Sequence, residues 1–270
     1  MTQTSIRENL LRIQQAIANA ATRAGRRAED ITLIGVSKTH PAIAIHEAYQ
    51  SGVRHFGENR VQEWEVKRVG TNNLAATWHL IGHLQSNKAV KAARLFHTVD
   101  SVDDFALAQK LDRSRAEANT SGKLRVLLEV RVEREETKSG VEITGLPELA
   151  EKVAALPNLE LAGLMCIPPF LGSVGAGFSP SPLSTVEAEL EPGSPPQSLR
   201  SGGPEPGPVS PTDAVRPYFR RLRELRDELK AKLGLPLPVL SMGMSHDFEV
   251  AIEEGATEVR VGTALFGGRT

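Results

Sequence analysis

The segment LSMGMSHDFEVAIEEGATEVRVGTALFGGR, residues 240–269, contains the pattern that decides the fold. Its two apolar runs predict one strand near 239–245 and another near 258–266. Between them, residues 246–254 have the spacing of an amphipathic helix. A strand, a helix and a second strand in so short a segment are typical of a parallel β/α unit.

The same alternation runs through most of the chain. The other predicted strands lie near 31–39, 55–59, 76–82, 97–101, 124–132 and 159–167. The other predicted helices lie near 41–51, 60–70, 86–94, 102–117, 145–155 and 213–233. Eight strands with helices between them predict a single (β/α)8 barrel, since such barrels often take about 200–250 residues. An open doubly wound sheet is the alternative, although the dinucleotide-binding motif GxGxxG does not follow the first strand.

Composition restricts the class of partner. The net charge is −1, so no bulk basic surface indicates nucleic acid. Cys166 is the only cysteine, which excludes an internal disulfide and a cysteine zinc site and favours a reducing compartment. No run approaches the ~20 apolar residues of a membrane span. The N-terminal residues predict an amphipathic surface helix rather than a secretory signal. We expect a cytoplasmic protein.

One region interrupts the alternation. Residues 172–212 are rich in proline, glycine and serine and poor in large apolar residues, which predicts a disordered insertion after the sixth strand. Connections at that end of a strand lie on the catalytic face of a barrel, so the segment is either an inert insertion or a flap over the mouth. We expect the rest of residues 1–270 to form one domain. The helix that follows mixes basic and acidic residues, as a solvated face does.

Lys38 stands at the end of the first predicted strand, in LIGVSKTHP (residues 33–41). Ile34, Val36 and Lys38 share one face of that strand. Burial lowers the pKa of an amine and makes it a better nucleophile towards aldehydes. A strand-end lysine that reaches solvent is the alternative, because lysine is rarely buried.

Hydroxyl residues follow the last two strands. Ser245 precedes a helical pattern with Asp247 and Glu249 in its first turn, which predicts a helix N-cap. Gly262 and Thr263 end the next strand. Barrels frequently bind phosphate in the loops after strands seven and eight, so these loops are a candidate phosphate site, with an ordinary cap as the alternative for Ser245.

Two more polar residues lie within predicted strands. Arg260 is on the same strand face as Gly262 and needs an acceptor, either a carboxylate or an unprotonated ring nitrogen. His79 is an isolated strand histidine, which is more often structural than catalytic. No HxxxH spacing or local carboxylate cluster indicates a metal site.

Several motifs together resemble a known family. VSKT, FGENRVQE, WHLIGHLQSNK, KSGV, GLMCIPP and the C-terminal segment occur in that order. They resemble the pyridoxal 5′-phosphate (PLP) homeostasis proteins, which are similar to the barrel domain of alanine racemase. The resemblance covers residues 5–171 and 213–269. It implies cytoplasmic, single-domain PLP carriers or regulators of vitamin B6 and amino-acid pools, without established turnover.

The resemblance also implies a set of cofactor contacts. Lys38 would hold PLP covalently as a Schiff base. The phosphate would lie against Ser245, Gly262 and Thr263, with Gly243 and Met244 close by. The ring would be lined by Asn59, His79, Ile81 and Met165, with Arg260 facing the pyridine nitrogen.

The residue chemistry favours a carrier over an enzyme. PLP withdraws electrons best when its ring nitrogen is protonated, and an arginine keeps that nitrogen neutral. Racemisation also needs a second base, but Tyr49 and Tyr218 lie in predicted helices, and we expect no second domain to supply another tyrosine. We expect a monomer that passes PLP to PLP-requiring apo-enzymes. An amino-acid racemase or lyase, and a barrel that binds a different phosphate ligand, are the alternatives.

One position departs from the family pattern. Arg131 stands where family members more often have a small polar residue such as asparagine. We expect this change to affect the wall of the site rather than the phosphate loops.

Overall fold

A computed structural model describes residues 5–118, 122–132, 139–169 and 212–268. Its strands are β1 (Thr32–Val36), β2 (His55–Glu58), β3 (Thr77–Leu80), β4 (Thr98–Val102), β5 (Leu124–Arg131), β6 (Val141–Glu142), β7 (Leu159–Met165), β8 (Val239–Ser241) and β9 (Glu258–Val261). Its α-helices are α1 (Ile6–Arg23), α2 (Ala42–Ser51), α3 (Val61–Lys67), α4 (Ala89–Leu95), α5 (Phe105–Ala116), α6 (Leu146–Ala154), α7 (Arg216–Leu233), α8 (Phe248–Glu253) and α9 (Thr263–Phe266). Of the predicted insertion 172–212, all but Thr212 lies outside the described residues.

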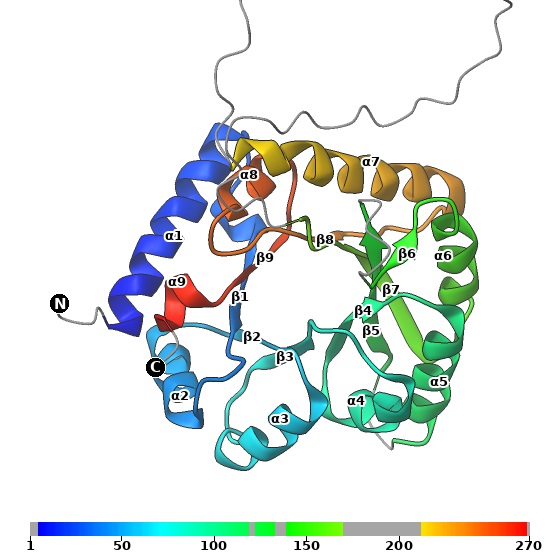
Figure 1. Cartoon of the computed structure of the whole chain (residues 1–270), viewed down its shortest axis with the longest axis horizontal. Helices are drawn as coiled ribbons and strands as arrows, with labels where there is room; N and C mark the ends of the chain where they lie inside the picture. Colours follow the sequence, from blue (N-terminus) through cyan, green and yellow to red (C-terminus); the bar gives the residue numbers. More distant parts are fainter. Residues whose placement is uncertain (1–4, 119–121, 133–138, 170–211, 269–270) are drawn as a thin grey trace, which may run out of the picture.

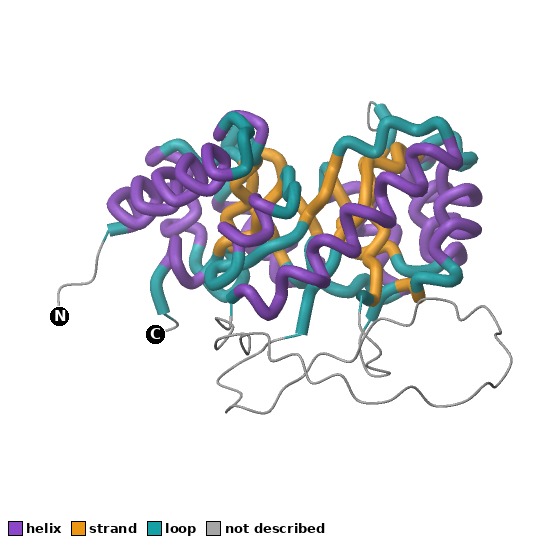
Figure 2. Tube along the Cα trace, turned by 90° about the horizontal axis from the view of Figure 1, so that it is seen from above, coloured by secondary structure: helices purple, strands orange, loops and turns teal. Residues whose placement is uncertain are grey.

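Eight of the strands close into a parallel barrel in the order β1-β2-β3-β4-β5-β7-β8-β9 (Figure 1). The pairing of β9 with β1 joins the two ends of the chain, with Arg260 in register with Ile34. The helices surround the strands, as the two perpendicular views show (Figures 1 and 2). The predicted (β/α)8 barrel is therefore confirmed. No helix of the described part of the chain is long and apolar enough to cross a membrane.

The N-terminal helix α1 covers the place where the barrel closes. Ser5 and Glu8 form a capping box at its start, which satisfies two backbone N–H groups. Its apolar stripe is buried, as the spacing predicts, and includes Ile6, Leu10, Ile13 and Ile17. The Asn9 side-chain amide donates a hydrogen bond to the Leu265 carbonyl oxygen at 3.0 Å, which ties α1 to α9.

Three predicted strands extend three or more residues too far, and two of them stop early for a local reason. β1 stops at Val36 because the chain turns, with the His40 N–H donating to the Ser37 carbonyl and Thr39 at a positive φ of 66°. β9 stops at Val261 because α9 begins at once. β8 stops at Ser241 rather than near 245. The additional strand β6 was not predicted, because two residues are too few to show a periodic pattern.

The core has two parts. A large cluster fills the space between the strands and the helices, with Trp64 and Trp78 stacked 3.6 Å apart. A smaller cluster of Leu127, Ala162, Met165 and Val239 packs separately from it. These four residues come from β5, β7 and β8, but β5 and β8 also carry the buried polar residues Glu129 and Ser241. Further buried polar side chains come from β3, β4 and β9.

Candidate functional site

Lys38 lies in the turn after β1 and is half-buried. Both neighbours in the chain are held in place. The Ser37 hydroxyl donates to Glu58 Oε1 at 2.7 Å, and the Thr39 backbone N–H donates to Glu63 Oε1 at 2.5 Å. These two hydrogen bonds fix the backbone on either side of Lys38, so the origin of its side chain is well defined.

Lys67, rather than Lys38, pairs with the nearby carboxylates of Glu58 and Glu63. Lys67 Nζ lies 3.0 Å from Glu58 Oε1 and 2.6 Å from Glu63 Oε1, and it donates to the Ser37 carbonyl at 2.7 Å. Burial raises the pKa of Glu58, while Lys67 opposes that shift. Within the described residues, the Lys38 amine forms no ion pair or hydrogen bond. It is therefore available to react.

Arg260 lies in β9, beside the strand that ends near Lys38, and is 4% exposed. Its acceptors are neither of the two predicted kinds. Its guanidinium donates to the carbonyl and the hydroxyl of Ser241, both at 2.8 Å, and to the Cys166 carbonyl at 2.7 Å. These bonds fix the guanidinium at the ends of β7 and β8. Arginine has five N–H donors, so it retains capacity to face a ligand.

The loops after β8 and β9 meet, as the phosphate hypothesis requires. The Ala264 backbone N–H donates to the Ser245 hydroxyl at 3.4 Å, which brings Ser245 beside Gly262 and Thr263. The backbone N–H groups of Ser245 and His246 have no acceptor among the described residues. Together with the Ser245 hydroxyl, they can bind an anion.

The prediction that Ser245 caps the following helix is wrong. α8 begins at Phe248, and Asp247 occupies the N-cap position. The Asp247 carboxylate accepts the Met244 N–H at 2.5 Å, which closes the turn before the helix. Gly243 is required there: its φ is +93°, and a Cβ would lie 2.6 Å from the Ala251 side chain. The Ser245 hydroxyl is thereby left for the neighbouring loop.

The residues predicted to line the ring differ in their burial and in their contacts. Ile81 and Met165 are buried, and Asn59 lies half-buried after β2, with its backbone against Gly82. His79 is fully buried, and its two ring nitrogens contact Asp100 Oδ2 at 3.3 Å and His55 Nδ1 at 3.1 Å. Both polar atoms of His79 are thus engaged by other barrel residues, in agreement with the structural interpretation of this histidine.

Sequence reasoning missed the residues that hold the site in shape. Lys67 and Ser241 are the most important of them. The i,i+4 spacing of Glu63 and Lys67 was the available signal for the first. Arg131 pairs with Glu142 of β6 at 3.2 Å, so the position that departs from the family pattern fastens β6 to β5.

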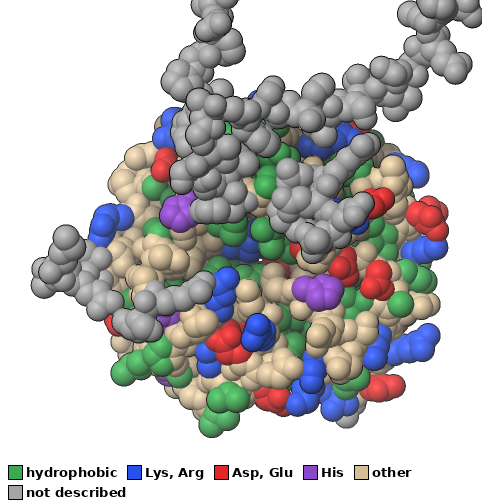
Figure 3. Space-filling model, viewed as in Figure 1, with side chains coloured by type: hydrophobic (Ala, Val, Ile, Leu, Met, Phe, Trp, Pro, Cys, Tyr) green, Lys and Arg blue, Asp and Glu red, His purple; other side chains and the backbone are tan. Residues whose placement is uncertain are grey.

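An open cleft of about 390 Å³ adjoins the loop after β8. Its lining includes Ser245, His246, Arg23 and Arg216, and both arginines are paired with glutamates. On the face shown in Figure 3, basic and acidic side chains are interspersed around the periphery.

Comparisons with known proteins identify the family of the chain. The sequence matches the family described as alanine racemase, N-terminal domain, over residues 9–270. It is 42% identical to the pyridoxal phosphate homeostasis protein of Aquifex aeolicus over 262 residues, 97% of each chain. It is 37% identical to the protein of that name from Escherichia coli K12 over 272 residues, covering 98% of this chain and 97% of the other.

Solved structures extend the comparison. PipY of Synechococcus elongatus, solved with PLP bound, is 35% identical to this chain with a TM-score of 0.70. The match covers 93% of this chain and 100% of the PipY chain. An alanine racemase of Clostridium difficile, 15% identical with a TM-score of 0.64, shares the fold. It covers 98% of this chain, which spans 57% of the racemase. The chain belongs to the alanine racemase N-terminal domain family and, within it, to the pyridoxal phosphate homeostasis proteins.

Proposed function

We propose that this chain binds PLP on Lys38 and takes part in PLP homeostasis without efficient turnover. One observation carries the proposal. Among the described residues the Lys38 amine has no acidic partner. Its turn follows the strand that pairs with β9, whose end meets the Ser245 loop. A reactive amine and an anion-binding pair of loops on adjacent strands match the aldehyde and the phosphate of PLP. PipY, 35% identical to this chain, was solved with PLP bound.

The residues present fit the cofactor. Bound PLP supplies an aldehyde and an electron-withdrawing ring. Lys38 would form the Schiff base, and Ser245, Gly262 and Thr263 would hold the phosphate. The fixed guanidinium of Arg260 would face the ring nitrogen and keep it unprotonated, which weakens carbanion chemistry. Gly243, Met244, Asn59, His79, Ile81 and Met165 remain predicted neighbours of the cofactor.

The proposal includes the setting of the activity. We infer a monomer in a reducing, cytoplasmic compartment, supported by the single cysteine, Cys166, which is buried. PLP-requiring apo-enzymes are the proposed recipients. Titrating the loaded protein with such an apo-enzyme, and comparing the transfer rate with the rate of release into buffer, tests direct delivery.

Mass spectrometry after borohydride reduction tests the covalent site. PLP is added to the purified chain, the adduct is reduced, and the modified lysine is located. We expect one adduct on Lys38, lost in Lys38→Ala and kept in Lys91→Ala, an exposed lysine paired only with Glu65. An adduct at another position, or none, would contradict the assignment.

Comparison of PLP with pyridoxal tests the phosphate loops. Ser245→Ala combined with Thr263→Ala should weaken PLP binding about tenfold or more and leave pyridoxal, which lacks the phosphate, unchanged. Equal losses for both ligands would show that the loops support the fold rather than the phosphate. A polarimetric screen with D- and L-amino acids separates the carrier from a racemase, because we expect no substantial turnover.

A further inference from the structure

Three ionisable side chains from separate strands meet among the buried residues of the barrel. They are His79 of β3, Asp100 of β4 and Glu258 of β9, each 3% exposed or less. One nitrogen of His79 and one oxygen of each carboxylate lie within 4.8 Å of one another. The sequence spacing shows nothing of this group, because barrel closure brings Glu258 beside residues more than 150 positions earlier.

Two oxygens of this group have no partner. Asp100 Oδ1 and Glu258 Oε2 are buried and accept no hydrogen bond from any described residue. Buried carboxylate oxygens are costly unless they are hydrogen-bonded or coordinate a cation. The two oxygens are therefore open to a hydrogen-bond donor or a cation.

His55 prepares His79 to act as a ligand. His55 Nδ1 lies 3.1 Å from His79 Nε2 and can accept a hydrogen bond from that nitrogen. His79 Nδ1, 3.3 Å from Asp100 Oδ2, would then be the nitrogen that binds an ion. Metal-bound histidines are usually oriented by such a bond on the other ring nitrogen.

Arg125 supplies the nearest compensating charge and can leave. Its Nη1 lies 3.6 Å from Glu258 Oε1, beyond hydrogen-bonding distance, and its side chain is 32% exposed. The guanidinium can swing into solvent, which would free Glu258 and open a path for an ion.

We propose that His79, Asp100 and Glu258 bind one divalent transition-metal ion that ties β3, β4 and β9 together. One imidazole and two carboxylates suit ions such as Zn²⁺, Mn²⁺ or Co²⁺. Metal–ligand bonds of about 2.1 Å would require only a small approach of ligand atoms that already lie within 4.8 Å of one another. The ion has a structural role here. His79, also a predicted neighbour of the cofactor, would belong to both sites.

Cobalt titration tests the site. The protein, made as Lys38→Ala so that PLP contributes no colour, is stripped with a chelator and titrated with Co²⁺, whose visible d–d absorption reports coordination. We expect one ion per chain and an increase in Tm on binding. Zn²⁺ should displace the cobalt signal.

Variants assign the ligands. Glu258→Gln and Asp100→Asn should each weaken Co²⁺ binding about tenfold or more. Arg125→Ala should tighten binding, because it removes the competing cation. Glu129→Gln is the matched control: Glu129 is also buried with an unpartnered oxygen, but it lies outside the three-ligand group, so its affinity should equal the parent value.

Two results would overturn the proposal. One is less than stoichiometric Co²⁺ binding by the stripped parent protein, which needs no variant to fold. The other is unchanged affinity in folded Glu258→Gln.

Discussion

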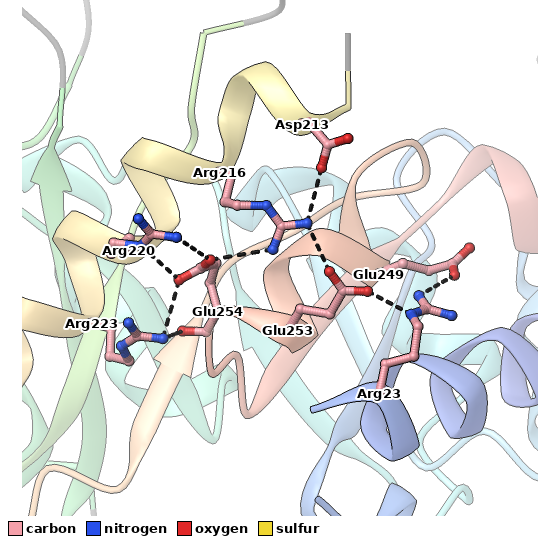
Figure 4. Close-up of polar contacts among 8 residues, drawn as sticks. All are labelled: Arg23, Asp213, Arg216, Arg220, Arg223, Glu249, Glu253 and Glu254. Atoms are coloured by element: carbon pink, nitrogen blue, oxygen red, sulfur yellow. Dashed lines mark hydrogen bonds and ion pairs between the residues drawn. The ribbon is translucent and has the colours of Figure 1, made fainter. Parts of the chain in front are cut away.

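Glu254 and Glu258 are the same residue type, four positions apart, and both are at least nine-tenths buried, yet their surroundings are opposite. Glu254 follows α8 and is surrounded by Arg216, Arg220 and Arg223 of α7, at 3.1 to 3.3 Å (Figure 4). Glu258 starts β9, and one of its oxygens has no partner among the described residues.

The pKa values separate accordingly. Burial alone would raise the pKa of Glu254, but hydrogen bonds from Arg220 and Arg216 lower it below the ordinary 4.5. For Glu258, burial and the charge of Asp100 raise the pKa. Helix α7 places three arginines against Glu254, whereas the one arginine that pairs with Glu258 among the described residues, Arg125, lies 3.6 Å away. The charges of His79, Arg125 and Arg260 lower the pKa of Glu258 without cancelling the effect of burial. Burial alone therefore does not decide whether a glutamate keeps its charge. The presence of cationic side chains within ion-pair distance does.

The largest expected effect tests this conclusion at a third buried glutamate, Glu58. Glu58 is fully buried, and Lys67 is its one cationic partner among the described residues. Lys67→Met should remove that partner and lower the free energy of unfolding by about 3–5 kcal/mol, because an uncompensated buried charge remains. Urea unfolding at pH 7 measures the loss.

The double variant Lys67→Met with Glu58→Gln is the control for this change. It should recover part of the loss, because no charge is left unpaired. If Lys67→Met lowers the free energy of unfolding by less than about 1 kcal/mol, the Lys67–Glu58 pair contributes little. That result would contradict the conclusion that close cationic partners stabilise buried glutamates.

A smaller loss is expected at Glu254. Glu254→Gln keeps the shape but weakens three charge-assisted contacts, and we expect a loss of about 1.5–3 kcal/mol at pH 7. The folded pKa of Glu254 is below 4.5, so its contribution is present above pH 4.5 and is lost as the pH falls through the folded value. The difference between variant and parent should therefore shrink in acid, and a constant difference would contradict the assigned cause.

Glu258→Gln should have the opposite sign. In metal-free protein at about pH 8, we expect a gain of about 1 kcal/mol, because the amide is uncharged and can donate to the free Asp100 oxygen. The folded pKa of Glu258 is above 4.5, so the parent loses stability as the pH rises from that value. The gain should therefore fade below pH 4.5. If Glu258→Gln is less stable than the parent at pH 8, the charge of Glu258 stabilises the fold, and the contrast with Glu254 is wrong.

Sequence reasoning predicted the barrel better than its buried charges. Periodicity found all eight barrel strands, and the predicted neighbourhood of the first and last strands is confirmed by the pairing of Ile34 with Arg260. That Lys38 and Arg260 face one cofactor stays a prediction. Strand ends were less accurate, because they depend on single turns such as the one at Thr39.

The polar contacts depend on details that a one-dimensional pattern does not contain. Asp247 takes the cap position predicted for Ser245, because α8 begins only at Phe248. The Asp247 carboxylate accepts from the Met244 N–H in the turn before the helix. Asp100 and Glu258 lie in separate apolar strands, and only the three-dimensional register brings them together.

The smallest expected effect lies at the edge of the arginine network. Glu249 pairs with Arg23 at 2.9 Å, but both side chains are nearly half exposed, at 47% and 49% (Figure 4). Water and salt screen such a pair, and Arg23 keeps Glu253 at 2.7 Å as an alternative partner. Glu249→Gln should therefore leave the urea midpoint at pH 7 unchanged within error. A clear loss there, comparable to that of Glu254→Gln, would mean that the whole network acts as one unit and that exposure does not distinguish its members.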